Sequence, residues 1–363
     1  MSLWDDLPST HGANFFKIWL TTKEHILLDS ACCSKSSREV YLSYSQITKF
    51  SAPIRVANQE IVQWFLQRKY SFSSLLFNLN EVPQADLNIR KFTQLLDLHT
   101  KEITKLTLSG NNTDIMVKVL LHTIVLQCTN INSLEILSGV PNDLIHTLIN
   151  SIPNNKITSL ILDNCYIEPI TLTLFNKNHN NLETLIFNSF SCSDQGTALM
   201  ILQGCCKNLK NLTIMNCNNM KVKTIFNFLT NCKNLLSITV QSLSDPGNLH
   251  IYCPHLRKIY INNASNMYDY ILLRLIKHFT FLTELCLLEC INLTNHSISQ
   301  LKNLNKLVLT GNNKITFRGS KYDMYRNSLD LHTVEFYQCS YLTRKYLQDE
   351  SKNMECLATM RAE

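Results

Sequence analysis

Cysteines are the most reactive side chains of this 363-residue chain, which contains 14 of them. Thiols can form disulfides, ligate metals or act in redox chemistry. Zinc sites favour the spacing C-x-x-C, but no such pair occurs, and Cys32-Cys33 and Cys205-Cys206 are adjacent. The first six residues are acidic and do not begin a signal peptide, so we expect the thiols to stay reduced. We therefore predict neither disulfides nor a metal site.

The other catalytic side chains do not form a known reaction pattern. The chain has no P-loop, G-x-S-x-G, H-E-x-x-H or kinase signature, and its 8 glycines argue against loops that cradle phosphate. His250 has no recognisable base or nucleophile beside it. The carboxylates Glu135 and Glu335 are far apart in the sequence. We expect a protein that is not an enzyme and binds no cofactor.

Charge and hydropathy argue against two classes of partner. Lys and Arg number 34 against 28 Asp and Glu, which gives a formal net charge of +6. This excess is mild and spread along the chain, so we expect no nucleic-acid partner and no membrane partner. No uninterrupted apolar stretch of 18 residues exists, and a transmembrane helix is not expected. The expected location is the cytoplasm, with the nucleus as an alternative.

A repeated spacing of apolar residues dominates the sequence. The pattern L-x-x-L-x-L-x-x-N/C, with weaker copies included, recurs ten times at start-to-start spacings of 21 to 28 residues. An eleventh, degenerate copy begins at Phe72, and we expect it to act as a cap. A repeat of this length cannot bury its apolar face alone, so the copies must stack. The ten copies start at Ile103, Ile131, Ile157, Leu182, Leu209, Leu235, Leu256, Leu282, Leu304 and Leu331.

Each repeat predicts one short strand and one return segment. In the central L-x-L, two side chains point inward and the one between them points outward. The Asn or Cys that follows is expected to point into the turn and to satisfy unpaired backbone groups. Residues 114–121, 222–229 and 268–278 have the composition of returning helices. The short spacing after Leu235, which contains Asp245-Pro246-Gly247, predicts an extended or 3₁₀ return there.

Eight cysteines lie at fixed positions of the repeat, which indicates a structural role. Buried thiols behave as small hydrophobic groups, so redox sensing is the weaker alternative. The cysteines occupy either the turn position (Cys165, Cys217, Cys290 and Cys339) or the position three residues before the first apolar residue (Cys128, Cys206, Cys232 and Cys253). From about residue 72 to 342 the chain resembles the cysteine-containing class of leucine-rich repeats. That resemblance implies an α/β solenoid, a horseshoe with a parallel inner sheet and a helical convex side.

Residues 1–45 do not follow the repeat and carry a different motif. Leu7-Pro8 precedes an apolar helix, and a T-x-x-E capping box at Thr21 and Glu24 precedes a second one. The second helix ends in a small residue, a cysteine and a later basic residue. This segment resembles an F-box, a small all-α head, but Ser36-Ser37 stand where that family usually has an aromatic residue.

An F-box-like head in front of leucine-rich repeats resembles the F-box/LRR proteins. These are substrate receptors of SCF-type (cullin–RING) ubiquitin ligases, whose F-box docks an Skp-type adaptor and whose repeats hold a protein substrate. The resemblance assigns adaptor contact to Leu7, Pro8, Phe15, Ile18, Leu20, Ile26, Leu27 and Cys32. It divides the chain into a head at 1–45, a linker or capping helix at 46–71, repeats at 72–345 and a tail at 346–363. The alternative is a stand-alone LRR scaffold whose N-terminus only caps the solenoid.

The outward strand positions predict where a partner binds. From Ile161 to Val308 the residues between and just after the inward positions are largely apolar or neutral. A long exposed apolar stripe normally marks a protein contact. The alternative is that β-branched residues simply suit strands. Lys105, Lys258 and Lys306 add a mild positive charge that tolerates an acidic partner. The predicted contact residues are Ile161, Ile186, Met215, Tyr260, Leu288, Val308 and Tyr337.

Overall fold

The computed structural model describes residues 54–55, 73–81, 94, 96–98, 100–192, 195–217, 220, 222–242, 249–298, 300–301, 304–312, 314 and 333–337. The F-box-like segment 1–45, with all residues predicted to contact an adaptor, and the tail 346–363 lie outside the described residues. The chain divides into two compact units, Met1–His179 (unit 1) and Asn180–Glu363 (unit 2), and each is described by itself.

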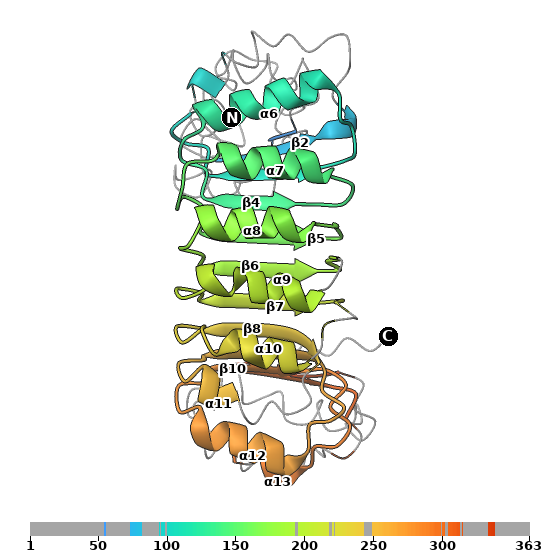
Figure 1. Cartoon of the computed structure of the whole chain (residues 1–363). Helices are drawn as coiled ribbons and strands as arrows, with labels where there is room; N and C mark the ends of the chain where they lie inside the picture. Colours follow the sequence, from blue (N-terminus) through green and yellow to red (C-terminus); the bar gives the residue numbers. More distant parts are fainter. Residues whose placement is uncertain are drawn as a thin grey trace, which may run out of the picture. The chain divides into compact units, whose positions relative to one another are not determined.

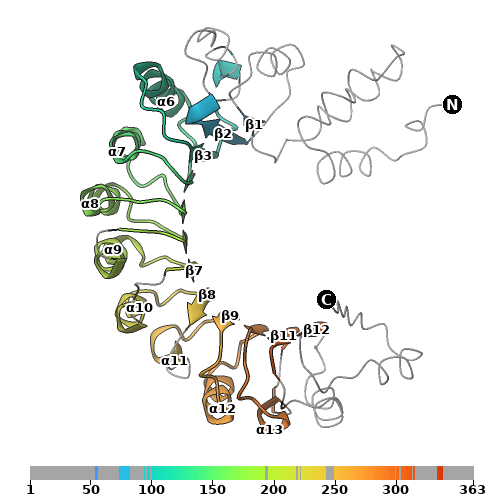
Figure 2. The same ribbon diagram turned by 90° about the vertical axis from the view of Figure 1, so that its right-hand side faces the viewer.

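Unit 1 is a parallel sheet with helices on one face. The strands follow chain order and are β1 (Ile54–Arg55), β2 (Ser74–Asn78), β3 (Lys105–Ser109), β4 (Ser133–Ile136) and β5 (Ser159–Asp163). A 3₁₀ turn, η1 (Leu79–Glu81), follows β2. The helices α6 (Ile115–Gln127), α7 (Asn142–Ser151) and α8 (Pro169–Asn178) lie side by side against that face (Figures 1 and 2).

Unit 2 repeats the same arrangement. Its parallel strands, again in chain order, are β6 (Thr184–Asn188), β7 (Asn211–Met215), β8 (Ser237–Ser242), β9 (Lys258–Asn263), β10 (Glu284–Leu287), β11 (Lys306–Thr310) and β12 (Thr333–Tyr337). The returning segments contain α9 (Gln195–Leu202), η2 (Gln203–Cys205), α10 (Val222–Leu229), α11 (Leu249–Tyr252), α12 (Asp269–His278) and α13 (Asn295–Ile298).

The predicted repeats are confirmed, since each of the ten copies contributes one strand and the copy at Phe72 contributes β2. Helix α10 has the predicted bounds, whereas α6 extends past residue 121 because Ile124 and Val125 are also buried. The prediction of an extended or 3₁₀ return after Leu235 is wrong in its described part. There Cys253 N–H donates to Leu249 O at 2.8 Å and closes one α-helical turn.

The inward positions of the strands form the core of each unit. In unit 1, Leu106 and Leu108 are fully buried, and the strand pairing aligns Leu106 with Leu134 of the next repeat. In unit 2, Leu212 and Ile214 occupy the same two positions and are also buried. Burial of such a side chain stabilises a fold by about 1.5–3 kcal/mol. The stacked repeats therefore supply the core that one repeat lacks.

The turn after each strand requires an unusual backbone at one residue. The residue before the turn Cys or Asn is left-handed in several repeats, with φ of 48° at Asn164, 54° at Asn216 and 68° at Gly311. Glycine and asparagine adopt this region at low cost. At Glu289, with φ 57°, the same conformation costs about 1 kcal/mol of folding free energy. A side chain at Gly311 would also lie 3.1 Å from Glu289 Cα, so the turns stack closely.

The turn position itself behaves as predicted in one repeat and differently in another. Asn312 is buried, and its Nδ2 donates to Leu293 O at 2.9 Å and to Cys290 O. Asn111 instead is exposed, and its backbone N–H donates to Asn80 Oδ1 at 2.9 Å. The difference arises because Asn80, from the degenerate copy, already occupies the turn beside Gly110.

Hydrogen bonds connect the starts of two successive helices, α12 and α13, in unit 2. Asp269, the first residue of α12, accepts hydrogen bonds from Thr294 N at 2.9 Å, Thr294 Oγ1 at 2.6 Å and Ser297 Oγ at 2.6 Å. Burial alone would raise the pKa of Asp269, but these bonds outweigh it and hold the pKa below its ordinary value. The carboxylate therefore stabilises unit 2 at neutral pH and loses this effect as the pH falls through its folded pKa.

We expect Asp269→Ala to lower the free energy of unfolding by about 2 kcal/mol, because it leaves three donors of the next repeat without an acceptor. Urea unfolding of the full chain measures this loss. The control is Asp143→Ala, which removes an exposed ion pair with Lys118 (2.9 Å) and should cost less than about 1 kcal/mol. Equal losses in the two variants would show that the Asp269 contacts do not stabilise α13.

Candidate protein-binding surface

The predicted contact residues lie on the sheet face opposite the helices, which we call the strand face. Ile161 in unit 1, and Ile186, Met215, Tyr260 and Leu288 in unit 2, are half-buried there. Val308 has the same orientation, but its side chain is 7% exposed and offers little surface. Tyr337 belongs to β12, where only the backbone is described.

The strand pairing in unit 2 divides these residues into two groups. Ile186 pairs with Thr213, and Thr213 pairs in turn with Thr239, so threonines interrupt the apolar row. Tyr260, Cys286 and Val308 pair directly with one another across three strands and form the continuous apolar part. Burial raises the pKa of Tyr260, so its hydroxyl remains neutral on this surface. The row of paired middle residues is therefore polar at Thr213 and Thr239 and apolar from Tyr260 to Val308.

Two of the lysines predicted to give the strand face a positive charge are neutralised there. Lys105 Nζ lies 2.5 Å from Glu135 Oε2, which also accepts a hydrogen bond from Thr107 Oγ1 at 2.9 Å. In unit 2, Lys258 Nζ lies 2.6 Å from Glu284 Oε1. These partners are one repeat apart in the sequence and become neighbours only when the strands pair.

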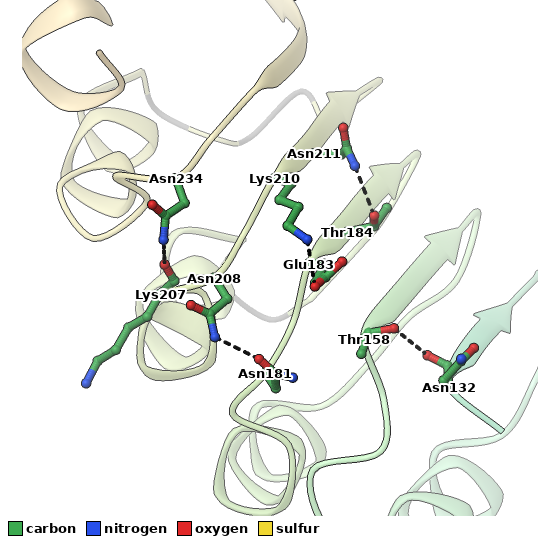
Figure 3. Close-up of polar contacts among 10 residues, drawn as sticks. All are labelled: Asn132, Thr158, Asn181, Glu183, Thr184, Lys207, Asn208, Lys210, Asn211 and Asn234. Carbon is green, nitrogen blue, oxygen red and sulfur yellow. Dashed lines mark hydrogen bonds and ion pairs between the residues drawn. The ribbon is translucent and has the colours of Figure 1, made fainter. Parts of the chain in front are cut away.

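The edge at which the strands begin carries a ladder of asparagine amides. Asn208 Nδ2 donates to Asn181 Oδ1 at 2.7 Å, and Asn234 Nδ2 donates to Lys207 O at 3.2 Å (Figure 3). In unit 1, Asn130 Nδ2 donates to Lys101 O at 2.9 Å in the same way. Sequence reasoning missed this ladder. Its signal is an asparagine directly before the first apolar residue of a repeat.

Backbone hydrogen bonds follow the same route between repeats. Two consecutive N–H groups, those of Leu236 and Ser237, donate to the single carbonyl of Lys210 at 2.8 and 2.9 Å. The N–H groups of Arg257 and Lys258 do the same with Leu236 O. Each repeat is thus aligned on the one before it at the start of its strand.

Cations gather at this edge in unit 2. We define the strand-start edge of unit 2 as residues 207–211, 233–237 and 255–258. Lys207, Lys233 and Arg257 are exposed on it and form no ion pair with any described residue. Lys210 Nζ pairs with Glu183 Oε1 at 2.8 Å, while the Lys207 side chain extends away from its neighbours (Figure 3).

The cysteines placed on the repeat register are buried wherever they are described. Burial raises the pKa of Cys128, Cys165 and Cys253 to about 12, so these thiols stay protonated at neutral pH. Cys205 Sγ lies 3.9 Å from Cys206 Sγ, and this contact, together with burial, raises the pKa of Cys206. Redox chemistry needs the thiolate, so these side chains serve as packing groups.

Within the described ranges, His, Cys, Asp and Glu form no cluster of three or more able to hold a metal ion.

Comparison with known proteins gives similarity to solved structures alone. No family model matches the chain, and no curated protein matches it. The chain is similar to a chain in the crystal structure of the yeast Rad7–Elc1 complex, with 13% identity and a TM-score of 0.48. The match covers 97% of this chain and 91% of that one. It is also similar to the leucine-rich repeat-containing protein LegL7 of Legionella pneumophila, with 16% identity and a TM-score of 0.46 over 73% of this chain and 92% of that one. A chain of the mouse RP105/MD-1 complex matches with 16% identity and a TM-score of 0.44 over 80% of this chain and 55% of that one.

The repeats, the parallel strands and the helical returns define a leucine-rich-repeat protein. This class of fold is a protein-interaction scaffold, because stacking leaves one face of the sheet available to a partner. No described helix is both long enough and apolar enough to cross a membrane.

Proposed function

We propose that this chain is an F-box-like LRR protein that recruits a protein substrate to an SCF-type ubiquitin ligase. Residues 1–45 would dock an Skp-type adaptor, and the strand face would hold the substrate. The observation that carries the proposal is the combination of an F-box-like sequence with a strand face that no described helix covers. A ligase subunit of this kind acts in the cytoplasm or the nucleus.

The strand face supports the second half of this proposal. The accessible side chains of its continuous apolar part, Tyr260 and Cys286, lie beside the half-buried Leu288. Aromatic and aliphatic groups of this kind supply most of the binding energy at protein interfaces. The charged and amide side chains at the strand starts would form the polar rim of such an interface.

The adaptor prediction can be tested by affinity purification of the full chain beside two variants. One variant lacks residues 1–45, and the other is the double substitution Leu7→Ser with Pro8→Ser. We expect the full chain to retain an Skp-type adaptor and both variants to lose it. We also expect substrate ubiquitination to fall when residues 1–45 are removed.

Thermal unfolding of the same three proteins distinguishes the ligase role from the alternative, a stand-alone LRR scaffold. If the N-terminus is only a cap of a stand-alone scaffold, its removal will cause unfolding or aggregation, with no separate loss of a partner. The double substitution keeps the segment in place, so an unchanged unfolding temperature with a lost adaptor supports the ligase role. Retention of the adaptor by both variants would contradict the ligase role.

A further inference from the structure

We propose that the strand-start edge of unit 2 binds a short acidic segment of a protein partner. This inference deepens the proposed function, and rests on it, in that the partner is the protein held by the repeats. Positive side chains that are spread along the sequence come together at this edge in the folded protein. Lys207, Lys233 and Arg257 come from three successive repeats and share one edge of the sheet.

The geometry of the stack brings these cations close together. Lys207 and Lys233 hold the same position in neighbouring repeats, whose strands lie about 4.8 Å apart, and Arg257 stands three positions further along in the next repeat. A segment of a few extended residues can span such neighbouring strand starts. The side chains are exposed and carry no ion pair with a described residue, so an acidic segment need displace no carboxylate of the described ranges.

The ends of the patch define what kind of anion it accepts. Glu183 lies at one end, paired with Lys210, and Glu284 lies at the other, paired with Lys258. A nucleic-acid backbone presents phosphates continuously and would meet these carboxylates on both sides of the cations. A segment with a few aspartates or glutamates can place its charges on the cations alone, so an acidic peptide fits this edge better than a nucleic acid.

The neighbouring groups also suit a peptide. The asparagines of the ladder, Asn208 and Asn234, directly follow Lys207 and Lys233, and each amide nitrogen has a second N–H besides the one that it donates within the ladder. The edge borders the strand face, where Tyr260 on β9 follows Lys258 by two residues. An acidic segment at the edge would therefore continue into the apolar contacts of the strand face.

Fluorescence anisotropy with the full chain tests this proposal. The probe is a short fluorescein-labelled peptide in which glutamates alternate with serines. We expect binding that weakens with rising salt, and Lys207→Glu with Lys233→Glu should weaken it by about tenfold or more. The matched control is Lys223→Glu with Lys314→Glu, which changes net charge equally at exposed sites outside the strand-start edge and should alter affinity by less than about twofold.

Three results would overturn the proposal. They are no binding of the probe, equal weakening by both double variants, and tighter binding of single-stranded RNA that is lost in the Lys207/Lys233 variant, which would indicate a nucleic-acid surface. The adaptor is absent from this assay, so its failure would leave the ligase proposal standing. Failure of the adaptor test would likewise leave the acidic-peptide result readable.

Discussion

Replacing Phe187 with alanine is expected to lower the free energy of unfolding of unit 2 by about 3–5 kcal/mol. Phe187 lies on β6 at an inward position, is fully buried and stacks on Phe190 with ring centroids 4.6 Å apart. Some other repeats have an aliphatic residue and a cysteine at these two positions, as at Ile214 and Cys217. Removal of the ring leaves a cavity beside Phe190 and Ile214, its partner on β7, that the buried neighbours cannot fully close.

Urea unfolding of the full chain measures this effect, with Phe281→Ala as the matched control. Phe281 is 66% exposed, so the same chemical change should cost less than about 0.5 kcal/mol there. If both variants unfold at the same urea concentration, the Phe187–Phe190 stack does not hold the repeat together.

The second large effect is a loss of stability in mild acid, caused by His179. This side chain is fully buried at the end of α8, and its ring lies 5.0 Å from the Phe175 ring. Burial lowers the pKa of His179 to about 4, an effect that the Ile149 backbone only partly offsets. Neither ring nitrogen reaches hydrogen-bond geometry with a described residue.

The direction of the effect follows from the two pKa values. The unfolded chain binds this proton near pH 6.5 and the folded chain near pH 4, so stability falls as the pH drops between these values. The expected loss is about 2 kcal/mol from pH 7 to pH 5 and about 3 kcal/mol in total, because each pKa unit corresponds to about 1.4 kcal/mol. Below about pH 4 both states bind the proton and the histidine adds no further slope.

Stability measured from pH 7 to pH 4 for the wild type and for His179→Leu checks this prediction. The leucine variant should lose the part of the slope that belongs to the histidine. Other acid-sensitive groups remain in both proteins and cancel in the comparison. The control is His146→Leu on α7, which makes the same substitution at an exposed position in the same unit. A His179→Leu protein with an unchanged pH dependence would contradict the assignment.

The strands were predictable from the sequence because the inward positions repeat at a fixed spacing with apolar residues. Helix ends were less predictable, since α6 continues through the polar residues His122 and Thr123 to bury Ile124 and Val125. The return after Leu235 was misjudged because Leu249 and Cys253 close a single helical turn despite the short spacing.

The candidate site was predictable in position but not in chemistry. The spacing placed Tyr260 and Ile186 on the strand face, but the threonines that separate them come from two other repeats. The pairing of Lys258 with Glu284 likewise joins residues 26 positions apart, which no local pattern reveals. The cations of the strand-start edge share one surface only after the repeats stack. Charge counted along the chain therefore understated its density in space.

The paired backbone donors at the strand starts make the whole repeat the natural unit of insertion or loss for this gene. The Lys210 carbonyl accepts the N–H groups of Leu236 and Ser237, and the Glu183 carbonyl accepts those of Lys210 and Asn211 by the same arrangement. If the residues between two equivalent positions were excised, the donors of the next repeat would meet an equivalent carbonyl. Loss of one or two residues at a strand start, as opposed to the returning segments whose length differs between repeats, would instead break this alignment. Unequal recombination can therefore lengthen or shorten this molecule in steps of one repeat without breaking its alignment.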